Sequence, residues 1–391
     1  MTAVSILHQH GFQDMVLLNG PSKIGAKILI SGGGKCNITN ADLKYDNFFG
    51  ESPNSIKKVI LQFPPEKVIQ FFEQDGLKFK VEPEWNKYFP SNGSSISVLE
   101  VLLKLLEKFS IPVLNFNKAN NFFYKNGFWY VETEKKTYRS EKLVVACGGL
   151  SYPQTGSDGS LWKIFEKMGI LMDEPYPALT PILTGDKDYH SLTGISLKCL
   201  ISVLKSGKII FKTIDSLLFT HSGLSGPGIL NVSHYFAKKT DDTDDYVLEI
   251  SFLPDSNTEK FKEEILDNKN SSLKLINYLS MKMPKRLAEI IVKRSNSDRK
   301  IAEIDKISRI RIINELFHFK PQIIKCAGYD VAEATGGGIK FSEIDLKTMG
   351  IKKYPGLYVT GEVINVHGII GGYNLQWAWS SGWVCGKGIF L

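Results

Sequence analysis

The sequence is poor in cysteine, and this scarcity excludes several classes of protein. Its 391 residues contain five cysteines, which lie far apart and include no CxxC pair. The sequence therefore predicts neither a disulfide framework nor a zinc site, and we expect no bound metal. Because free thiols suit a reducing compartment, we expect the protein to be cytoplasmic.

Long apolar runs are also missing. No run approaches the roughly 18 residues that a membrane-spanning helix needs. The first ten residues, MTAVSILHQH, lack the cationic start of a signal peptide. We therefore expect neither a membrane partner nor export.

A strong excess of charge of one sign is absent as well. The chain has 48 Lys and Arg against 41 Asp and Glu, a net charge of +7. We interpret this as a mild bias spread along the chain, too weak to indicate nucleic acid, so no nucleic-acid partner is expected. A small-molecule substrate and an anionic cofactor are compatible with it. The run KKTDDTDD, residues 238–245, changes sign halfway, which indicates a solvated loop.

Glycine is abundant where it can serve a ligand. In ILISGGGKCNITN, residues 28–40, an apolar stretch that we predict to be a strand leads into three glycines. Backbone without side chains can approach a phosphate or a flat ring and adopt positive φ. A tight turn is the alternative interpretation of the triplet alone.

Three further segments carry glycine at the end of a predicted strand or the start of a helix. KLVVACGG (142–149) and PGLYVTGE (355–362) are predicted buried strands, and GGYNLQWAWSSGWVCGKGI (371–389) is a predicted helix after a glycine turn. A helix N-terminus suits a pyrophosphate or an electron-rich ring edge. Strand ends of an α/β sheet meet at one crevice, so we predict one shared cofactor site.

The order of the remaining predicted elements indicates an α/β domain split by an insertion. A helix over 2–10 precedes a strand over 15–19, which is the second half of a βαβ unit. Either the fold manages without the first strand, or Met1 is an internal methionine. The later elements are a helix (98–109), a hairpin (127–140), strands (198–212, 246–254 and 329–341) and a helical region (256–320).

Taken together, these segments resemble one family, the BaiN-like or aminoacetone oxidase-type FAD-dependent NAD(P)H oxidoreductases among the two-dinucleotide-binding-domain flavoproteins. The resemblance covers nearly the whole chain in family order. It is carried by LISGGGKCNITN (29–40), ACGGLSYPQTGSDGSLW (146–162), PALTPILT (177–184), LLFTHSGLSGPGIL (217–230), EATGGGI (333–339) and GLYVTGEVINVHGIIGGYNLQWAWSSG (356–382).

The resemblance implies an α/β fold in which a Rossmann-like FAD-binding domain is interrupted by a β-barrel-like insert and a helical subdomain. The implied parts are an FAD-binding domain in two pieces (1–178 and 341–391), a β-rich insert (179–255), a helical subdomain (256–322) and a return strand of the insert (323–340). The implied activity is hydride or electron transfer through FAD, with NAD(P)H or a small organic substrate as the donor.

The resemblance also implies which residues line the cofactor. Asn19 stands at the adenosine ribose position, Ala119 on the strand near adenine, Glu362 near the ribityl chain, and Asn374 with Leu375 beside the isoalloxazine. The other positions expected along FAD are Lys27, Gly32, Gly33, Gly34, Lys35, Cys36, Asn37, Gly148, Gly361, Gly371 and Gly372.

The sequence departs from the family pattern at several of these places. The first strand and its GxGxxG turn are not found, Asn19 replaces a glutamate, Ala26 and Lys35 replace two arginines, and Asn365 replaces an aspartate. A charge-assisted hydrogen bond to the ribose is therefore lost at Asn19. An N-terminally truncated, flavin-free remnant that acts as a non-catalytic binding protein is the alternative hypothesis.

Few residues are candidates for proton transfer. His367, in a glycine-rich segment near the expected flavin, is the candidate catalytic residue, and His221 is a weaker one. Cys36 has no second cysteine at CxxC spacing, so a small buried filler is the favoured interpretation. Trp377, Trp379 and Trp383 have a helical spacing that predicts burial in the core.

Overall fold

The computed structural model describes residues 1–391 except residues 10, 13, 22, 239–245, 268–271 and 391. The described chain divides into two compact units. Unit 1 comprises Met1–Pro177 and Ala332–Leu391, and unit 2 comprises Ala178–Val331. Nearly all of the predicted solvated loop at 238–245 lies outside the described residues. Within the part of the chain that the structure describes, no helix has the length and apolar character to cross a membrane.

A four-stranded sheet in unit 1 brings together two glycine segments that are far apart in the sequence. Its strands, in order, are β10 (Leu143–Val145), β21 (Leu357–Val359), β20 (Gly350–Ile351) and β19 (Ile344–Asp345). β10 and β21 are parallel, so their carboxyl ends lie at the same edge of the sheet. The segments that follow these two strands therefore emerge side by side.

Smaller sheets complete the strands of unit 1. The pairs and triplets are β1 (Leu17–Leu18) with β6 (Val113–Leu114), β3 (Phe48–Phe49) with β22 (His367–Gly368), β11 (Met172–Ala178) with β18 (Ala334–Ile339), β2 (Thr39–Asn40) with β5 (Lys87–Pro90) and β4 (Phe79–Glu82), and β7 (Ala119–Lys125) with β8 (Phe128–Thr133) and β9 (Thr137–Ser140). The predicted strand over 15–19 and the hairpin over 127–140 are thereby confirmed, although β1 is only two residues long.

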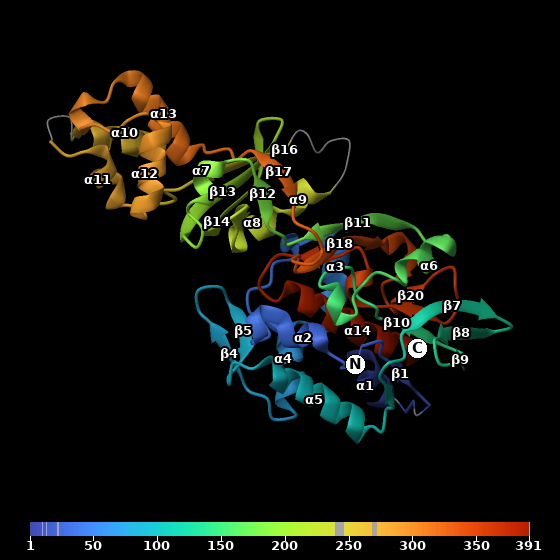
Figure 1. The fold of residues 1–391 in the computed structure, drawn as a ribbon. Coiled ribbons are helices and arrows are strands. Elements are labelled where there is room, and N and C mark those ends of the chain that lie inside the picture. Colours follow the sequence, from blue (N-terminus) through green and yellow to red (C-terminus); the bar gives the residue numbers. More distant parts are fainter. Residues whose placement is uncertain (10, 13, 22, 239–245, 268–271, 391) are drawn as a thin grey trace. The chain divides into compact units, whose positions relative to one another are not determined.

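The C-terminal helix α14 (Tyr373–Phe390) is the long central helix of unit 1 (Figure 1). It packs closely on α1, because a Cβ added to Gly386 would lie 2.7 Å from the Ala3 carbonyl oxygen. Trp377 and Trp379 are buried, as their spacing predicts, and Trp383 is half-buried. The other helical segments are α1 (Thr2–Gln9), α2 (Ala26–Ile30), η1 (Ser31–Gly34), η2 (Tyr45–Asn47), α3 (Pro53–Ile60), α4 (Pro65–Glu73), α5 (Ser95–Lys108), η3 (Pro153–Thr155), α6 (Trp162–Lys167), η6 (Phe341–Glu343) and η7 (Gly361–Val363).

The prediction of a strand before the glycine triplet is wrong. Residues Ala26–Ile30 form the helix α2, which starts after Gly25 in the left-handed region, with φ +79°. Gly25 is needed there because a Cβ would collide with the Leu99 side chain of α5. Of the short apolar run only Ile28 is buried, and Ile30 is 43% exposed, so this is no buried strand. An apolar run this short does not distinguish helix from strand by periodicity.

Unit 2 combines an antiparallel sheet with a group of helices. The sheet runs in the order β16 (Tyr246–Ser251), β13 (Ser196–Lys205), β14 (Lys208–Thr220), β15 (Gly223–Ser225), β12 (Ile182–Thr184) and β17 (Ile323–Cys326). Its helices are α7 (Lys187–His190), α8 (Pro227–Val232), α9 (His234–Ala237), α10 (Thr258–Asp267), α11 (Leu275–Ser280), α12 (Lys285–Arg294), η5 (Ile301–Glu303) and α13 (Lys306–Phe317). Figure 1 shows α10 to α13 gathered into one helical group, drawn in gold to orange.

The region 323–340 departs from the single return strand that we expected. It contains two strands with different partners, because β17 joins the sheet of unit 2 and β18 pairs with β11. The chain passes from unit 2 back to unit 1 between them, at Ala332.

Candidate cofactor site

The carboxylate of Glu362 is the centre of a hydrogen-bond network at the edge of the β10–β21 sheet. Lys27 Nζ lies 2.6 Å from Glu362 Oε2, which also accepts a bond from the Gly149 amide at 3.0 Å. Glu362 Oε1 accepts bonds from the Thr335 amide at 2.9 Å and from Ser151 Oγ at 3.4 Å. An ionised carboxylate has about four acceptor positions. All four are therefore used, by donors from three segments of unit 1: Lys27, the turn that holds Gly149 and Ser151, and Thr335.

The turn after β10 fits this network only with glycine. A Cβ at Gly149 would collide with the Thr335 hydroxyl, and one at Gly148, where φ is +73°, would lie 2.6 Å from Ser157 Oγ. Thr335 Oγ1 in turn accepts bonds from the amides of Leu150 and Ser151, at 2.8 and 3.1 Å. The turn is thus held rigidly beside Glu362 by side chains that pack where glycine leaves space.

The glycine triplet forms a left-handed loop on the surface. Gly32, Gly33 and Gly34 have φ values of +56°, +65° and +85°. Gly32 and Gly33 are exposed, and a Cβ on Gly33 would meet no atom within 4 Å. Lys35, which follows, is also exposed. The loop therefore presents open backbone and one cation, while the Lys27 that precedes it binds Glu362.

The end of the glycine loop is joined to the start of α14. With its amide turned to satisfy its neighbours, Asn37 accepts a bond from the Gly372 amide at 3.0 Å and donates to the Thr39 carbonyl at 2.9 Å. A Cβ on Gly372, where φ is +90°, would lie 2.6 Å from the Thr39 carbonyl carbon. Asn40 Nδ2 donates to the Gly371 carbonyl at 3.1 Å.

The other residues at the start of α14 are fixed by the same unit. Asn374 exchanges two bonds with the backbone of Gly368, at 2.9 and 3.1 Å, and Leu375 packs on a neighbouring apolar cluster. Trp377 Nε1 donates to the Gly361 carbonyl at 3.1 Å, which ties the helix to the end of β21. Gly361 itself has φ +75° and open space where a Cβ would be.

Of the two residues expected near the adenosine, Asn19 comes directly after β1 and Ala119 begins β7. The Asn19 amide donates to the Pro21 carbonyl and to Asn115 Oδ1, both at 2.8 Å. Asn19 follows β1, which is parallel to β6. Ala119 is the first residue of β7 and is paired with Thr133 of β8. The Asn19 amide thus binds its own unit.

Asn365 has an evident structural reason to be an amide. Its Nδ2 donates to Asp173 Oδ2 at 2.9 Å, to the Gly50 carbonyl and to Glu51 Oε1, both at 3.3 Å. Asp173 also binds Lys340, at 2.8 Å. An aspartate at position 365 would place a third carboxylate between the other two.

Of the three residues considered for chemistry, His367 and Cys36 are buried, whereas His221 is exposed and lies in unit 2. His367 is 1% exposed and lies between Phe49 and Tyr176, with ring centroids 5.4 and 5.7 Å away. Its catalytic role stays a prediction. The Cys36 side chain is fully buried, and burial raises the pKa of its thiol to about 11. A thiol with so high a pKa is almost wholly protonated near neutral pH and is a poor nucleophile.

The structure places eight of the sixteen residues predicted along the cofactor in two groups of contacts in unit 1. Lys27, Gly148, Gly361 and Glu362 surround the tip of β21, and Asn37, Gly371, Gly372 and Asn374 fix the start of α14. Sequence reasoning missed Thr335 and Ser151 as members. Both lie in motifs with adjacent glycines, EATGGGI and ACGGLS, which is the signal that could have identified them.

The site combines parallel strands, glycine turns at the strand ends and a carboxylate fixed by hydrogen bonds. These features are typical of one class, the Rossmann-like dinucleotide-binding proteins. Residues 1–388 match the family model described as the HI0933-like protein Rossmann domain. The chain belongs to this family, an FAD-binding family of oxidoreductases, and its expected α/β, Rossmann-like fold class is confirmed. The resemblance found in the sequence is also confirmed.

Three curated relatives match almost the whole chain. A ribosomal RNA dihydrouridine synthase of Haemophilus influenzae is 32% identical, over 96% of this chain and 92% of its own. A protein of the same name from Escherichia coli is 30% identical, over 95% and 91%. A 3-dehydro-bile acid delta(4,6)-reductase of Clostridium scindens is 24% identical, over 99% and 95%.

Solved structures of low identity share the fold. A variant of the FrdA subunit of Escherichia coli quinol fumarate reductase has a TM-score of 0.51 and 12% identity, covering 100% of this chain and 67% of its own. A 3-ketosteroid delta1-dehydrogenase from Sterolibacterium denitrificans has a TM-score of 0.50 and 11% identity, covering 100% and 97%. At such identity the likeness concerns the fold alone.

Proposed function

We propose that the protein is an FAD-dependent reductase of carbon–carbon double bonds conjugated to a carbonyl, with NAD(P)H as the electron donor and an RNA uridine as the substrate. The observation that carries the proposal is the network around Glu362, in which three segments of one unit converge on the carboxylate at the tip of β21. Such an arrangement is the strand-end crevice at which dinucleotides bind in α/β sheets.

The names of the relatives support the reaction class. Forming dihydrouridine adds two hydrogens across the uracil double bond, which is conjugated to a ring carbonyl. A delta(4,6)-reductase of a 3-dehydro bile acid acts on double bonds conjugated to the ketone at carbon 3. Relatives with these two names match this chain over at least 91% of their own lengths. The bond reduced is the property that their different substrates share.

The choice of RNA follows from the order of similarity. The two relatives named for ribosomal RNA are 32% and 30% identical, whereas the bile acid reductase is 24% identical. A steroid-like substrate is the second candidate within the same reaction class, and the assay below distinguishes the two.

The residues at the strand tips fit a bound FAD. The exposed, left-handed backbone at Gly32 and Gly33 can lie against a flat ring or a phosphate, and Lys35 is an exposed cation that suits the phosphate. The open space at Gly361 adds a second place for close approach. A ribityl hydroxyl can reach Glu362 by replacing the Ser151 hydroxyl, whose 3.4 Å bond is the longest of the four.

FAD, when bound, supplies two-electron transfer from NAD(P)H to the double bond. The protein's own residues then have three tasks. Lys27 pairs with Glu362, at 2.6 Å, and so holds the carboxylate in place at the tip of β21. The glycine turn at Gly148 and Gly149 fixes that carboxylate in position, and the bonds of Asn37 and Asn374 fix the start of α14.

The test uses the purified full-length protein. We expect a yellow preparation, or one that becomes yellow with added FAD, whose flavin absorbance is bleached by NADH or NADPH without oxygen. Added ribosomal RNA that lacks dihydrouridine should restore the absorbance, and mass spectrometry of its nucleosides should show uridine that has gained two hydrogens. If only a 3-keto-4,6-diene steroid restored the flavin absorbance, the steroid-like substrate would be favoured over RNA.

A variant addresses the cofactor step separately. Lys27→Gln removes the cation from Glu362 and is expected to weaken FAD retention about tenfold or more, since breaking a partly buried pair leaves an uncompensated charge. Lys23→Gln, on the neighbouring surface segment, is the matched control. A preparation that stays colourless with added FAD would instead favour the flavin-free binding protein.

A further inference from the structure

The chain's excess positive charge is concentrated in the helices of unit 2. Residues 274–311 contain 11 Lys and Arg against 4 Asp and Glu, a net charge of +7. The remaining residues contain 37 of each. On its small size alone, we interpret the net charge as spread along the chain. The count shows instead that the excess of cations lies in residues 274–311. A domain whose cations gather in one short region has the composition of a polyanion-binding surface.

The first half of α13 displays these cations on an exposed helix surface. Lys306, Arg309 and Arg311 are all exposed, and between them lie Ile307 and Ile310, which are 64% and 51% exposed. We call these five residues the α13 stripe. These two isoleucines add apolar area next to the cations, and they are not needed to hold α13 in place, because Ile312 and Leu316 of the same helix are buried.

The cations of the stripe have no acidic partner within the described part of the chain. Among the described residues, Lys306, Arg309 and Arg311 take part in no ion pair. By contrast, Lys293 binds Asp188 at 3.0 Å and Arg294 binds Glu315 at 3.0 Å. The positive field of the stripe is therefore available to an external partner.

Further basic residues extend the surface next to the stripe. Lys274 and Lys300 face each other in a backbone bridge, and both are exposed. Arg309 Nε donates to the Ile304 carbonyl at 3.3 Å, which keeps its guanidinium close to the segment after Lys300. Three acids, Asp298, Glu303 and Asp305, lie in the same stretch, and Asp305 is occupied with capping α13 through Ser308.

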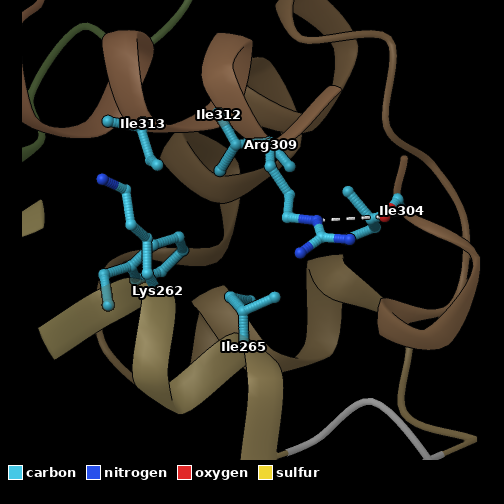
Figure 2. A pocket seen from close by; sticks show the side chains of 7 residues that line it. Lys262, Ile265, Ile304, Arg309, Ile312 and Ile313 are labelled. Atoms are coloured by element: carbon cyan, nitrogen blue, oxygen red, sulfur yellow. Dashed lines mark hydrogen bonds between the residues drawn. The ribbon is translucent and has the colours of Figure 1, made fainter. Parts of the chain in front are cut away.

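The hollow beside Arg309 indicates how a partner is recognised. Figure 2 shows Lys262 of α10 and Arg309 of α13 on either side of it, with Ile265 and Ile312 between them. Its volume is about 10 Å³, enough for a single water molecule. No base or other flat group fits inside. A polyanion would therefore contact the outer surface of the helices, where the exposed cations lie, and not this hollow.

We infer that the α13 stripe, extended by Lys274 and Lys300, is a docking surface for the phosphate backbone of RNA. The inference rests on the proposed function for the choice of RNA among polyanions. The inference adds to the proposed function a surface in the helical part of unit 2 that binds RNA independently of base identity. Phosphate contacts of this kind position a nucleic acid without reading its sequence.

The experiment measures binding of a fluorescein-labelled RNA hairpin to the full-length protein by anisotropy at several salt concentrations. The test variant is K306Q/R309Q/R311Q, and the control is K198Q/K208Q/K212Q, which removes three exposed cations from β13 and β14 of the same unit. Every cation removed from a phosphate should reduce the salt slope of log affinity by about 1. We expect the test variant to bind at least about tenfold more weakly, with a slope reduced by about 2 to 3 on the same rule.

Further readouts separate this inference from the proposed function. Thermal unfolding and FAD absorbance should be unchanged in both variants, which shows that they fold. Hairpin binding that disappears only in the test variant supports the surface even if no uridine is reduced. Equal binding by both variants and wild type overturns it, even if uridine is reduced. Preferential binding of the wild type to vesicles of anionic phospholipid rather than to the hairpin would also overturn it.

Discussion

At the scale of single residues, Asn365 shows how one amide makes two acidic groups compatible. Its Nδ2 donates to Asp173 and to Glu51, at 2.9 and 3.3 Å, and the side chain is 2% exposed. A donor is required at this point because neither carboxylate can donate when ionised. Asn365 stands where the family has an aspartate, and its amide suits the two neighbouring carboxylates of this chain.

Asn365→Asp should therefore destabilise the protein. The substitution removes a buried donor and adds a like charge, so we expect a loss of about 1 to 3 kcal/mol in the free energy of unfolding at neutral pH. Urea denaturation measures it. Asn365→Ala, which removes the donor without adding charge, is the matched control. An aspartate variant as stable as the alanine variant would show that the two carboxylates do not repel it.

At the scale of elements, two glycines with similar backbone angles have different structural roles. Gly372 at the start of α14 has φ +90° and no room for a Cβ, because the Thr39 backbone lies 2.6 Å from its place. Gly33 has φ +65° and open space around it. The first glycine is required by packing, whereas the second is explained by access to a ligand.

Alanine substitutions should separate these roles. Gly372→Ala must displace backbone, and we expect it to cost at least about 3 kcal/mol of unfolding free energy. Gly33→Ala should cost only about 1 kcal/mol, the strain of its positive φ, but should weaken FAD retention. Thermal unfolding and flavin titration of the two variants measure this. Unchanged FAD binding in Gly33→Ala would remove the loop from the cofactor site.

The contact between α10 and α11 has a predictable dependence on pH. Glu264 of α10 accepts bonds from Lys282, at 2.8 Å, and from the Tyr278 hydroxyl of α11. These bonds hold the pKa of the Glu264 carboxyl below its usual value. Because the folded pKa is lowered, this stabilisation is present above the unfolded pKa and is lost as the pH falls through the folded one.

Glu264→Gln should remove this dependence. The two side chains are partly exposed, at 31% for Lys282 and 27% for Glu264, so solvent screening limits the expected loss at neutral pH to less than about 1 kcal/mol. The difference between wild type and variant should shrink as the solution is acidified toward the folded pKa of Glu264. Urea denaturation at a series of pH values measures it. A difference that stays constant across the series would contradict the ionic origin of the contact.

At the scale of the whole molecule, the two units should respond differently to ligands. FAD is proposed to bind residues of unit 1, and a ligand stabilises the state that binds it by about 2.7 kcal/mol at 100 times its dissociation constant. Amide hydrogen exchange with added FAD should therefore slow in segments 31–37, 146–151 and 361–375. Exchange in residues 274–311 should not change. Slowing in 274–311 alone would refute the proposed cofactor site.

Much of the fold could be predicted from local patterns. The helices at Ser95–Lys108 and Tyr373–Phe390 and the hairpin of β8 and β9 follow from apolar spacing and turn residues. The segment Ala26–Ile30 could not be assigned this way, because five residues are too few to show a period. Its helical form depends on the close approach of Gly25 to α5.

The sequence by itself determined the family, the glycines that leave room for a cofactor, and the charges available to a partner, since these depend on residue type and order. Tertiary structure decided which of those residues meet. Lys27, Gly149 and Thr335 are separated by up to 308 positions, and only the folded backbone shows that they share one acceptor, Glu362. Hydrogen-bond partners depend on the path of the backbone in space, which no local spacing of residues specifies.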